Sequence, residues 1–350
     1  MIFSPDLEAP LLMTGATGFI GHHVARAFYR AGYSNLRLLA RDPAGLAIIS
    51  DVPHTVVKGD LRDETVVRKA LDGVEGVVHL AADYRMWVRD PAELDAVNVD
   101  ASRSLGQWSL DAGVARFCHC SSVAAIGRTS GAWPSDETVP WNLGWTRDAY
   151  TASKFRGEEE IKALFKSGLP GVIVNPSAPI GPGDIKPTPT GQMIVDFLNR
   201  QVPAWFDGGF DLVDVEDVAQ GFLLVYEQGR EHEQYILGGD NLTLKQIYGM
   251  ASEISEIPAP SLRLPSWSVV PSATLMEWWA RLTNTRPVLT TGGARMVMLP
   301  PWYDDTKARQ ELGYQTRPFR AAMERAIIDF YQRGLATPKP GSLMARLLRK

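Results

Sequence analysis

Short apolar runs alternate with amphipathic stretches through the first half of the chain. The apolar runs at 10–14, 35–40, 54–58, 76–81, 116–121 and 171–175 predict strands. The stretches at 19–30, 64–71, 94–112 and 150–166 predict helices. Strands that alternate with helices of this length indicate an α/β fold with a doubly wound parallel sheet. Sheets of this kind bind their ligands beyond the carboxyl ends of the strands.

The pattern changes after Pro176, because five prolines within 176–190 predict a loop. Helices predominate from residue 193 onward, and the strands become short. We therefore expect a core at 1–176, to whose sheet residues 211–225 return, and a smaller, mainly helical lobe at 177–336. Residues 337–350 are expected to form a flexible tail.

Composition and charge narrow the function class. The 350 residues are 45% hydrophobic and 22% charged, an ordinary globular mixture. A net charge of −4 disfavours nucleic acid as a partner. No apolar stretch has the length of a membrane span, and residues 1–10 lack the basic start of a signal peptide, so the expected compartment is the cytoplasm.

Cysteine usage excludes two further classes. The only two cysteines, Cys118 and Cys120, cannot form a disulfide framework. Strand alternation sends both to one face of the sheet and His119 to the other, so no metal site is expected.

A glycine-rich turn follows the first predicted strand and opens the first predicted helix. Glycines stand at 15, 18 and 21, with Thr17, Phe19 and Ile20 between them. Glycine permits the tight turn and lets backbone N–H groups approach a pyrophosphate at the helix N-terminus. The order of strand, glycines and helix predicts a dinucleotide site, and a plain strand-to-helix turn is the alternative.

The end of the second predicted strand bears on the choice of cofactor. Many NAD enzymes have an acid there to bind the ribose 2′-hydroxyl, whereas this chain has Ala40, Arg41 and Asp42. Arg41 is suited to a 2′-phosphate, so NADP(H) is favoured. NAD(H), with Asp42 on the ribose, is the alternative. The ends of the third and fourth strands add four expected cofactor contacts: Asp60, Leu61, Ala81 and Ala82.

A proton-transfer pair is predicted at the start of the helix at 150–166. Tyr150 and Lys154 are four residues apart and so share one helix face. A lysine beside a tyrosine favours the phenolate and is expected to lower the pKa of the phenol, which makes Tyr150 a general acid or base. Ser122, at the end of the fifth strand, is expected to hydrogen-bond a substrate oxygen.

These motifs together resemble the extended short-chain dehydrogenase/reductase family, in its epimerase/dehydratase and dihydroflavonol-reductase-like group, from about Leu11 to about Arg333. The resemblance implies a Rossmann fold, a catalytic set of Ser122, Tyr150 and Lys154, and cofactor contacts from Gly15, Gly18 and Gly21. It also implies that Asn98 lies near the cofactor and that the protein is a homodimer.

A narrower resemblance is carried by the segments 81–87, 175–182, 184–191 and 236–243, which are similar to the bacterial hopanoid-associated sugar epimerases (HpnA). This resemblance implies a role in hopanoid-linked metabolism. From these segments we expect substrate contacts at Tyr84, Trp87, Asn175 and Lys186 and a cofactor contact at Pro176.

Three functions follow from these observations. The first is an NAD(P)-dependent oxidoreductase that transfers hydride at a secondary hydroxyl or keto group of a small molecule, which Arg41 favours. The second is a nucleotide-sugar epimerase that retains NAD. The third is a non-catalytic cofactor-binding regulator. The apolar stretch 275–282 and the tail at 343–348 also suggest weak, peripheral contact with the inner membrane surface.

Overall fold

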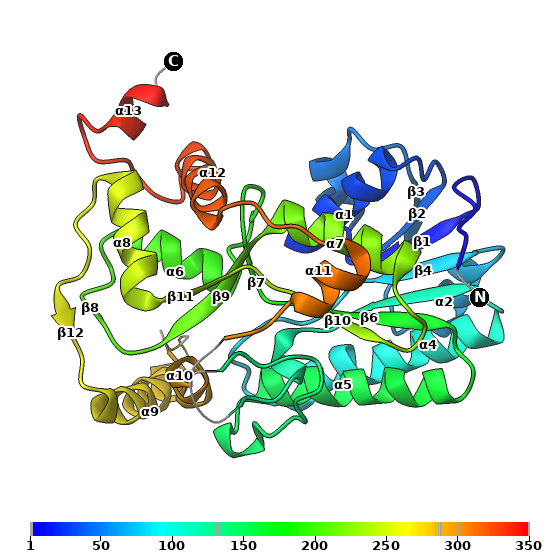
Figure 1. Ribbon diagram of the computed structural model, residues 1–350, viewed down its shortest axis with the longest axis horizontal. Coiled ribbons are helices and arrows are strands. Elements are labelled where there is room, and N and C mark those ends of the chain that lie inside the picture. Colours follow the sequence, from blue (N-terminus) through cyan, green and yellow to red (C-terminus); the bar gives the residue numbers. More distant parts are fainter. Residues whose placement is uncertain are drawn as a thin grey trace.

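A sheet of seven parallel strands forms the centre of the molecule (Figure 1). The computed structural model describes residues 3–129, 133–283, 285, 287, 289–299 and 302–348. The strand order is β10-β6-β5-β4-β1-β2-β3. The strands are β1 (Leu11–Thr14), β2 (Leu36–Ala40), β3 (Thr55–Lys58), β4 (Gly76–His79), β5 (Arg116–Cys120), β6 (Gly171–Pro176) and β10 (Gln234–Leu237). The predicted doubly wound parallel sheet is confirmed.

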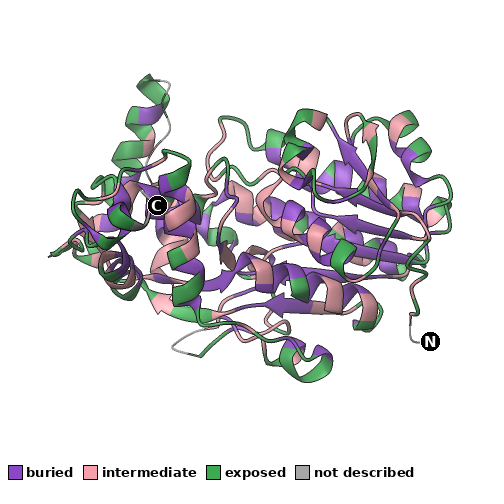
Figure 2. Ribbon diagram, turned by 90° about the horizontal axis from the view of Figure 1, so that it is seen from above, coloured by how far each residue is buried: buried purple, intermediate pink, exposed green. Residues whose placement is uncertain are grey.

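The inner strands are buried on both faces, which explains their nearly continuous apolar sequences. Every residue of β1, β4, β5 and β6 is buried, whereas the edge strand β3 is largely exposed. Figure 2 shows this distribution, with buried positions along the sheet and exposed positions on the outer sides of the helices.

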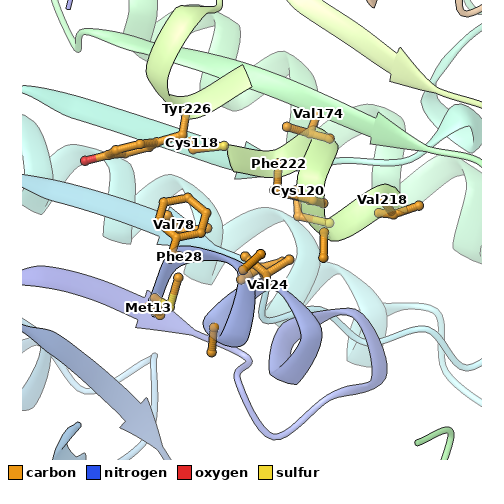
Figure 3. Close-up of a cluster of buried hydrophobic side chains, with 14 of the residues drawn as sticks. Met13, Val24, Phe28, Val78, Cys118, Cys120, Val174, Val218, Phe222 and Tyr226 are labelled. Carbon is orange, nitrogen blue, oxygen red and sulfur yellow. The ribbon is translucent and has the colours of Figure 1, made fainter. Parts of the chain in front are cut away.

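Helices cover both faces of this sheet. One face is covered by α1 (Phe19–Arg30), η1 (Pro43–Ile49), α7 (Val215–Gln228) and α11 (Thr306–Leu312). The other is covered by α2 (Glu64–Leu71), α4 (Ser102–Asp111) and α5 (Ala149–Lys166). Figure 3 shows the first of these two apolar layers, in which Phe28 of α1 and Phe222 of α7 pack over the sheet.

Both cysteines lie in the layer of Figure 3, while His119 on the same strand contacts His79, with 5.3 Å between the ring centroids. The alternation predicted along this strand is therefore present. Within the described residues no group of histidine, cysteine and acidic side chains is arranged to hold a metal ion.

The helix predicted at 94–112 is interrupted in its first half. It consists of α3 (Ala92–Asp95), a π-helical segment at Ala96–Ala101 and α4. Such π-turns are frequent at functional sites. This one contains Asn98, whose backbone α5 approaches so closely that a Cβ atom on Gly157 would lie 2.1 Å from the Asn98 carbonyl oxygen.

The second half of the chain forms a lobe beyond the carboxyl ends of β6 and β10. The chain runs from β6 directly into β7 (Ala178–Ile180) and from β10 into β11 (Asp240–Thr243). These strands flank β9 (Gly209–Asp214) in a small sheet, and β8 (Ala204–Trp205) pairs with β12 (Leu262–Arg263). The lobe helices are α6 (Pro189–Leu198), α8 (Leu244–Ser255), α9 (Ser266–Thr283), α10 (Thr291–Met298), α12 (Phe319–Gln332) and α13 (Leu343–Leu347).

Two boundary expectations differ from the structure. Residues 211–225 do not add a strand to the main sheet: they form the end of β9 in the small sheet and most of α7, which covers the main sheet. The strand that extends the main sheet is β10. The expected flexible tail contains α13, whose Met344 is 3% exposed and packs with the core of the lobe. Only part of this tail, including Leu343, is exposed.

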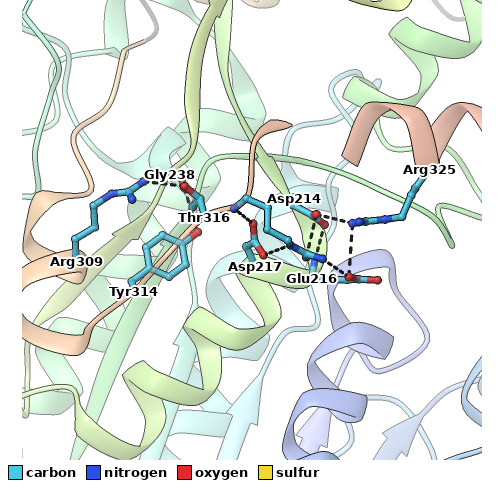
Figure 4. A network of polar contacts seen from close by, with 9 residues as sticks. Asp214, Glu216, Asp217, Gly238, Arg309, Tyr314, Thr316 and Arg325 are labelled. Carbon is cyan, nitrogen blue, oxygen red and sulfur yellow. Dashed lines mark hydrogen bonds and ion pairs between the residues drawn. The ribbon is translucent and has the colours of Figure 1, made fainter. Parts of the chain in front are cut away.

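A network of charged side chains joins the lobe to the start of α7 (Figure 4). Arg317, between α11 and α12, contacts Asp214 at 2.9 Å and Asp217 at 2.7 Å. Arg325 of α12 also binds Asp214, which is buried. A buried charge is costly unless it is paired or hydrogen-bonded, so removing Arg317 or Arg325 would leave Asp214 poorly compensated at the junction of lobe and core.

Candidate active site

The turn after β1 is shaped by close backbone contact. Gly15 has φ +77°, and a Cβ atom there would lie 2.5 Å from the Ala81 nitrogen. A Cβ atom on Gly21 would lie 2.0 Å from the Gly15 carbonyl oxygen. Both positions therefore require glycine, and the turn lies directly against the end of β4.

The first turn of α1 provides free backbone donors at this position. The Gly18 N–H group donates to the Gly15 carbonyl at 2.9 Å, and Gly18 caps the helix without a side chain. The N–H groups of Phe19, Ile20 and Gly21 belong to the first helical turn and so lack intrahelical acceptors. Thr17 is exposed beside them. The glycine cradle and the helix N-terminus fit the pyrophosphate of a dinucleotide.

Arg41 and Asp42 follow β2 and differ in their bonding. Arg41 is exposed and makes no hydrogen bond or ion pair to the described residues, whereas Asp42 Oδ1 accepts the Ala44 N–H at 3.1 Å. Asp42 is thus used as the cap of η1.

Asp60 and Leu61 follow β3. Arg62 binds the Asp60 carboxylate at 2.8 Å, and the hydrogen bonds from Arg62 lower the Asp60 pKa to about 2. Leu61 is 8% exposed and packs with the apolar layer under α2 and α4. The turn after β3 is therefore held by the Asp60–Arg62 pair and by the packing of Leu61.

Ala81 and Ala82 are half-buried at the end of β4, beside the glycine turn. Their position is fixed by Thr14, whose hydroxyl accepts the Ala81 N–H at 3.2 Å and lies 2.7 Å from His79 Nδ1. Thr14 and His79 are support residues that the sequence analysis missed. The sequence signal for these two residues is that each is a polar residue at the end of an apolar strand, β1 for Thr14 and β4 for His79.

Ser122, Tyr150 and Lys154 converge at the carboxyl end of β5. The Ser122 hydroxyl lies close enough to Tyr150 to favour the phenolate, and Ser122 Oγ accepts the Ala124 N–H at 3.1 Å. Lys154 is 4% exposed, and its Nζ donates to the Cys120 carbonyl at 3.0 Å. The lysine therefore anchors the start of α5 to the end of β5.

The Tyr150 pKa is raised rather than lowered as expected, because burial outweighs the effects that lower it. Burial raises the pKa of Tyr150 above its usual value, and the hydrogen bond from Ser122 opposes this only in part. Burial also lowers the pKa of Lys154. The cause is desolvation, which disfavours the charged form of each group. Tyr150 is therefore a neutral phenol at neutral pH and is suited to donate a proton.

Two buried acids position α5, and the sequence analysis singled out neither. Asp148 accepts the Thr151 N–H at 2.8 Å and so caps the helix two residues before Tyr150. Glu158 lies one turn beyond Lys154, and its side chain is 1% exposed and paired with Lys162 at 2.7 Å. The sequence signal for Asp148 was an acid just before the predicted helix start, and the signal for Glu158 was a lysine four residues later.

Asn175 does not line the site as expected. It is completely buried, and its Nδ2 donates to the Ser122 carbonyl at 3.0 Å and to Glu158 at 2.7 Å. As the next-to-last residue of β6, it lies under the catalytic turn and supports Ser122 from below. Pro176, which follows it, is also buried.

Asn98 connects the π-helical segment to the site. Its Oδ1 accepts the Asp83 N–H at 2.8 Å, and its Nδ2 donates to the Asp83 carbonyl and to Ser153 Oγ, both at 2.9 Å. Ser153 Oγ in turn donates to the Tyr150 carbonyl at 2.8 Å. Asn98 therefore holds the loop after β4 beside the helix turn that bears Tyr150.

The remaining expected substrate contacts lie on two loops. Tyr84 is 43% exposed and Trp87 is half-buried in the loop after β4. The indole N–H of Trp87 is buried and has no acceptor among the described residues. Lys186 is exposed between β7 and α6.

Comparison with known proteins gives a consistent result. The family described as the NAD dependent epimerase/dehydratase family matches residues 11–238. A putative dihydroflavonol 4-reductase from Synechocystis sp. is 36% identical over 92% of this chain and 94% of its own length. Sterol demethylase protein B from Methylococcus capsulatus is 33% identical over 93% and 99%. The solved structure of gox2253 superposes with a TM-score of 0.84 at 41% identity, covering 94% of this chain and all of that one.

Proposed function

Since the chain belongs to the NAD-dependent epimerase/dehydratase family, we propose that it is a reductase-type member that interconverts a ketone and a secondary alcohol on an apolar substrate in hopanoid-linked metabolism. The observation that carries this proposal is the placement of Ser122, Tyr150 and Lys154 together at the end of β5, where Lys154 binds the Cys120 carbonyl, beside the β4 end that holds the glycine turn. The chemistry common to the family is hydride transfer that depends on NAD(P).

A bound nicotinamide dinucleotide supplies the hydride. Gly15, Gly18 and Gly21 would hold its pyrophosphate against the N-terminus of α1. Ser122 would orient the substrate oxygen, and Tyr150 would donate a proton to that oxygen as it gains charge. Lys154 keeps the first turn of α5 against β5 through its bond to the Cys120 carbonyl.

The protonated state of Tyr150 suits the reductive direction. Burial raises the pKa of this phenol, so the group holds its proton at neutral pH. A protonated phenol can serve as an acid toward a carbonyl oxygen, which is the requirement of reduction. NADPH is the dinucleotide suited to net reduction, and Arg41, which is exposed after β2, would bind its 2′-phosphate.

Replacing Arg41 by alanine is expected to weaken NADPH binding by about 10- to 100-fold and to leave NADH binding nearly unchanged. The reason is that a charge-assisted hydrogen bond to a phosphate contributes roughly 1.5–3 kcal/mol, and NADH lacks that phosphate. Fluorescence titration with each dinucleotide measures the two dissociation constants. Arg320→Ala, an exposed arginine on α12, is the matched control. Equal weakening for both dinucleotides would contradict the role given to Arg41.

The two other functions have weaker support. A nucleotide-sugar epimerase needs a retained NAD. The observation that favours this function is Asp42, which could bind the NAD ribose, but the Asp42 carboxylate already caps η1. A non-catalytic regulator is set aside because the family and the relatives named above are enzymes. The homodimer and the location at the inner membrane surface remain part of the proposal.

The proposed substrate class, a ketone on a fused-ring molecule, is based on the names of the two relatives and can be tested with candidate substrates. The two relatives are named for a dihydroflavonol and a sterol, both of which contain fused rings. We expect the purified protein to consume NADPH with a fused-ring ketone and to yield the corresponding alcohol. The proposal would be contradicted if the protein consumed NADPH with a nucleotide-linked 4-keto sugar but with none of a panel of cyclic ketones.

A further inference from the structure

Helix α9 turns its large apolar side chains to the solvent. Trp267 is 80% exposed, Leu275 is 65% exposed and Leu282 is 62% exposed. Trp278 and Trp279 are 56% and 61% exposed. Isolated exposed apolar residues are ordinary, but five of them on one helix form a continuous surface that marks an interaction site.

The spacing of these residues makes a single stripe. Trp267, Leu275, Trp278 and Leu282 are separated by eight, three and four residues, and the exposed Pro271 lies halfway between the first two, which places all five on one face. Position 279 lies beside that face. At 1.5 Å per residue, the stripe is about 22 Å long.

The opposite face of α9 carries the small residues. Val269, Ala273 and Ala280 are buried, and the first two pack with Ala294 of α10. A helix that is amphipathic in the ordinary sense turns its largest apolar residues inward. Here the small residues face the protein and the tryptophans face outward, so burial in this chain does not account for the tryptophans.

The chemistry of the stripe fits the interface of a bilayer. Tryptophan combines a large apolar ring with one N–H donor and is enriched where a membrane meets water. The one acid of α9, Glu277, is 20% exposed, pairs with Arg281 at 3.1 Å and accepts the Thr291 N–H. The stripe therefore presents no free negative charge to a lipid surface. No described helix is long and apolar enough to cross a membrane, so the contact would be interfacial.

The position of α9 connects this surface to the active site (Figure 1). Its partner α10 packs against the segment before Tyr150: a Cβ atom on Gly292 would lie 2.8 Å from the Asp148 Cα atom. Arg295 of α10 also donates to the Thr146 carbonyl at 3.2 Å. The α9–α10 pair is thus built directly on the residues that cap the catalytic helix.

We propose that the α9 stripe rests on a lipid bilayer at the headgroup level and that the apolar substrate reaches the site from this membrane. The second part rests on the proposed function; the first part stands on the exposed stripe alone. The membrane then supplies a substrate that has little solubility in water, and α10 keeps the active-site entrance close to it.

The test is co-sedimentation of the full chain with vesicles of phosphatidylcholine, alone and mixed with phosphatidylglycerol. We expect the protein to sediment with both and binding to change little with salt, because apolar insertion rather than charge drives it. The W278S/W279S double variant should bind at least about tenfold more weakly, since two large apolar side chains are lost from the interface. W133S, which changes an indole that is 79% exposed outside α9, should bind like the parent.

Three results would overturn this proposal: no sedimentation of the parent with either vesicle, unchanged binding of the double variant, or a dimer of the parent in light scattering that the double variant lacks. The last result would assign the stripe to a second copy of the chain. Failure of the proposed function is distinguishable, because vesicle binding would then persist without reduction of any apolar ketone. The double variant should retain NADPH binding, which shows that it is folded.

Discussion

Replacing Tyr150 by phenylalanine is expected to lower turnover by about two to four orders of magnitude, the usual contribution of a positioned proton donor. The substitution removes only the hydroxyl that would donate the proton, and the ring keeps its place in the half-buried turn. The dissociation constant of NADPH and the melting temperature should stay near those of the parent. Turnover in the Tyr150→Phe variant is measured with the best ketone found for the parent.

The control for this variant is Tyr331→Phe. Tyr331 is 6% exposed in α12, and its hydroxyl has no hydrogen-bond partner among the described residues. The same atom is therefore removed from a buried tyrosine of the lobe, and turnover should not change. Near-parental turnover in Tyr150→Phe would exclude this residue as the proton donor, and an equal loss in Tyr331→Phe would point to a general structural effect.

Replacing Gly15 by alanine should abolish measurable dinucleotide binding, with a loss of at least about 100-fold. Two penalties combine at this position. The backbone has φ +77°, which an L-residue adopts at a cost of about 1 kcal/mol, and the new Cβ atom would lie 2.5 Å from the Ala81 nitrogen. The backbone of the turn has to move, and the cradle for the pyrophosphate moves with it. Fluorescence titration with NADPH measures the loss.

Gly113→Ala separates these two penalties. Gly113 has φ +71°, close to that of Gly15, but nothing lies within 4 Å of a Cβ atom built there. It lies in the turn before β5, at the other end of that strand from Ser122. This variant should lose about 1 kcal/mol of stability and bind NADPH normally. Normal binding in Gly15→Ala would mean that the turn is not the cofactor cradle.

The sheet could be predicted from the sequence because each strand is identified by a short run of neighbouring residues. The buried strands are short apolar runs, and the glycines at 15 and 21 are required by backbone contacts that any dinucleotide turn of this kind makes. The Tyr150 and Lys154 pair was found for the same reason, since both lie on one turn of one helix.

Features that depend on distant parts of the chain were not predictable in this way. Asn175 was expected to contact substrate from its place at the end of a predicted strand, but its amide instead binds Glu158 of α5 and the Ser122 carbonyl. The pKa of Tyr150 is governed by how completely the loops exclude water, which no residue spacing gives. The outward direction of Trp278 depends on which face of α9 packs on α10.

The identity of the bound nucleotide tests the central claim most directly. The protein is purified, any nucleotide is released with acid and identified by mass, and the emptied or exchanged site is titrated with NADPH and NADH. A reductase in which Arg41 selects the cofactor should release its nucleotide during purification and bind NADPH far more tightly than NADH. Stoichiometric NAD that survives purification would contradict the account and indicate an epimerase that recycles its cofactor.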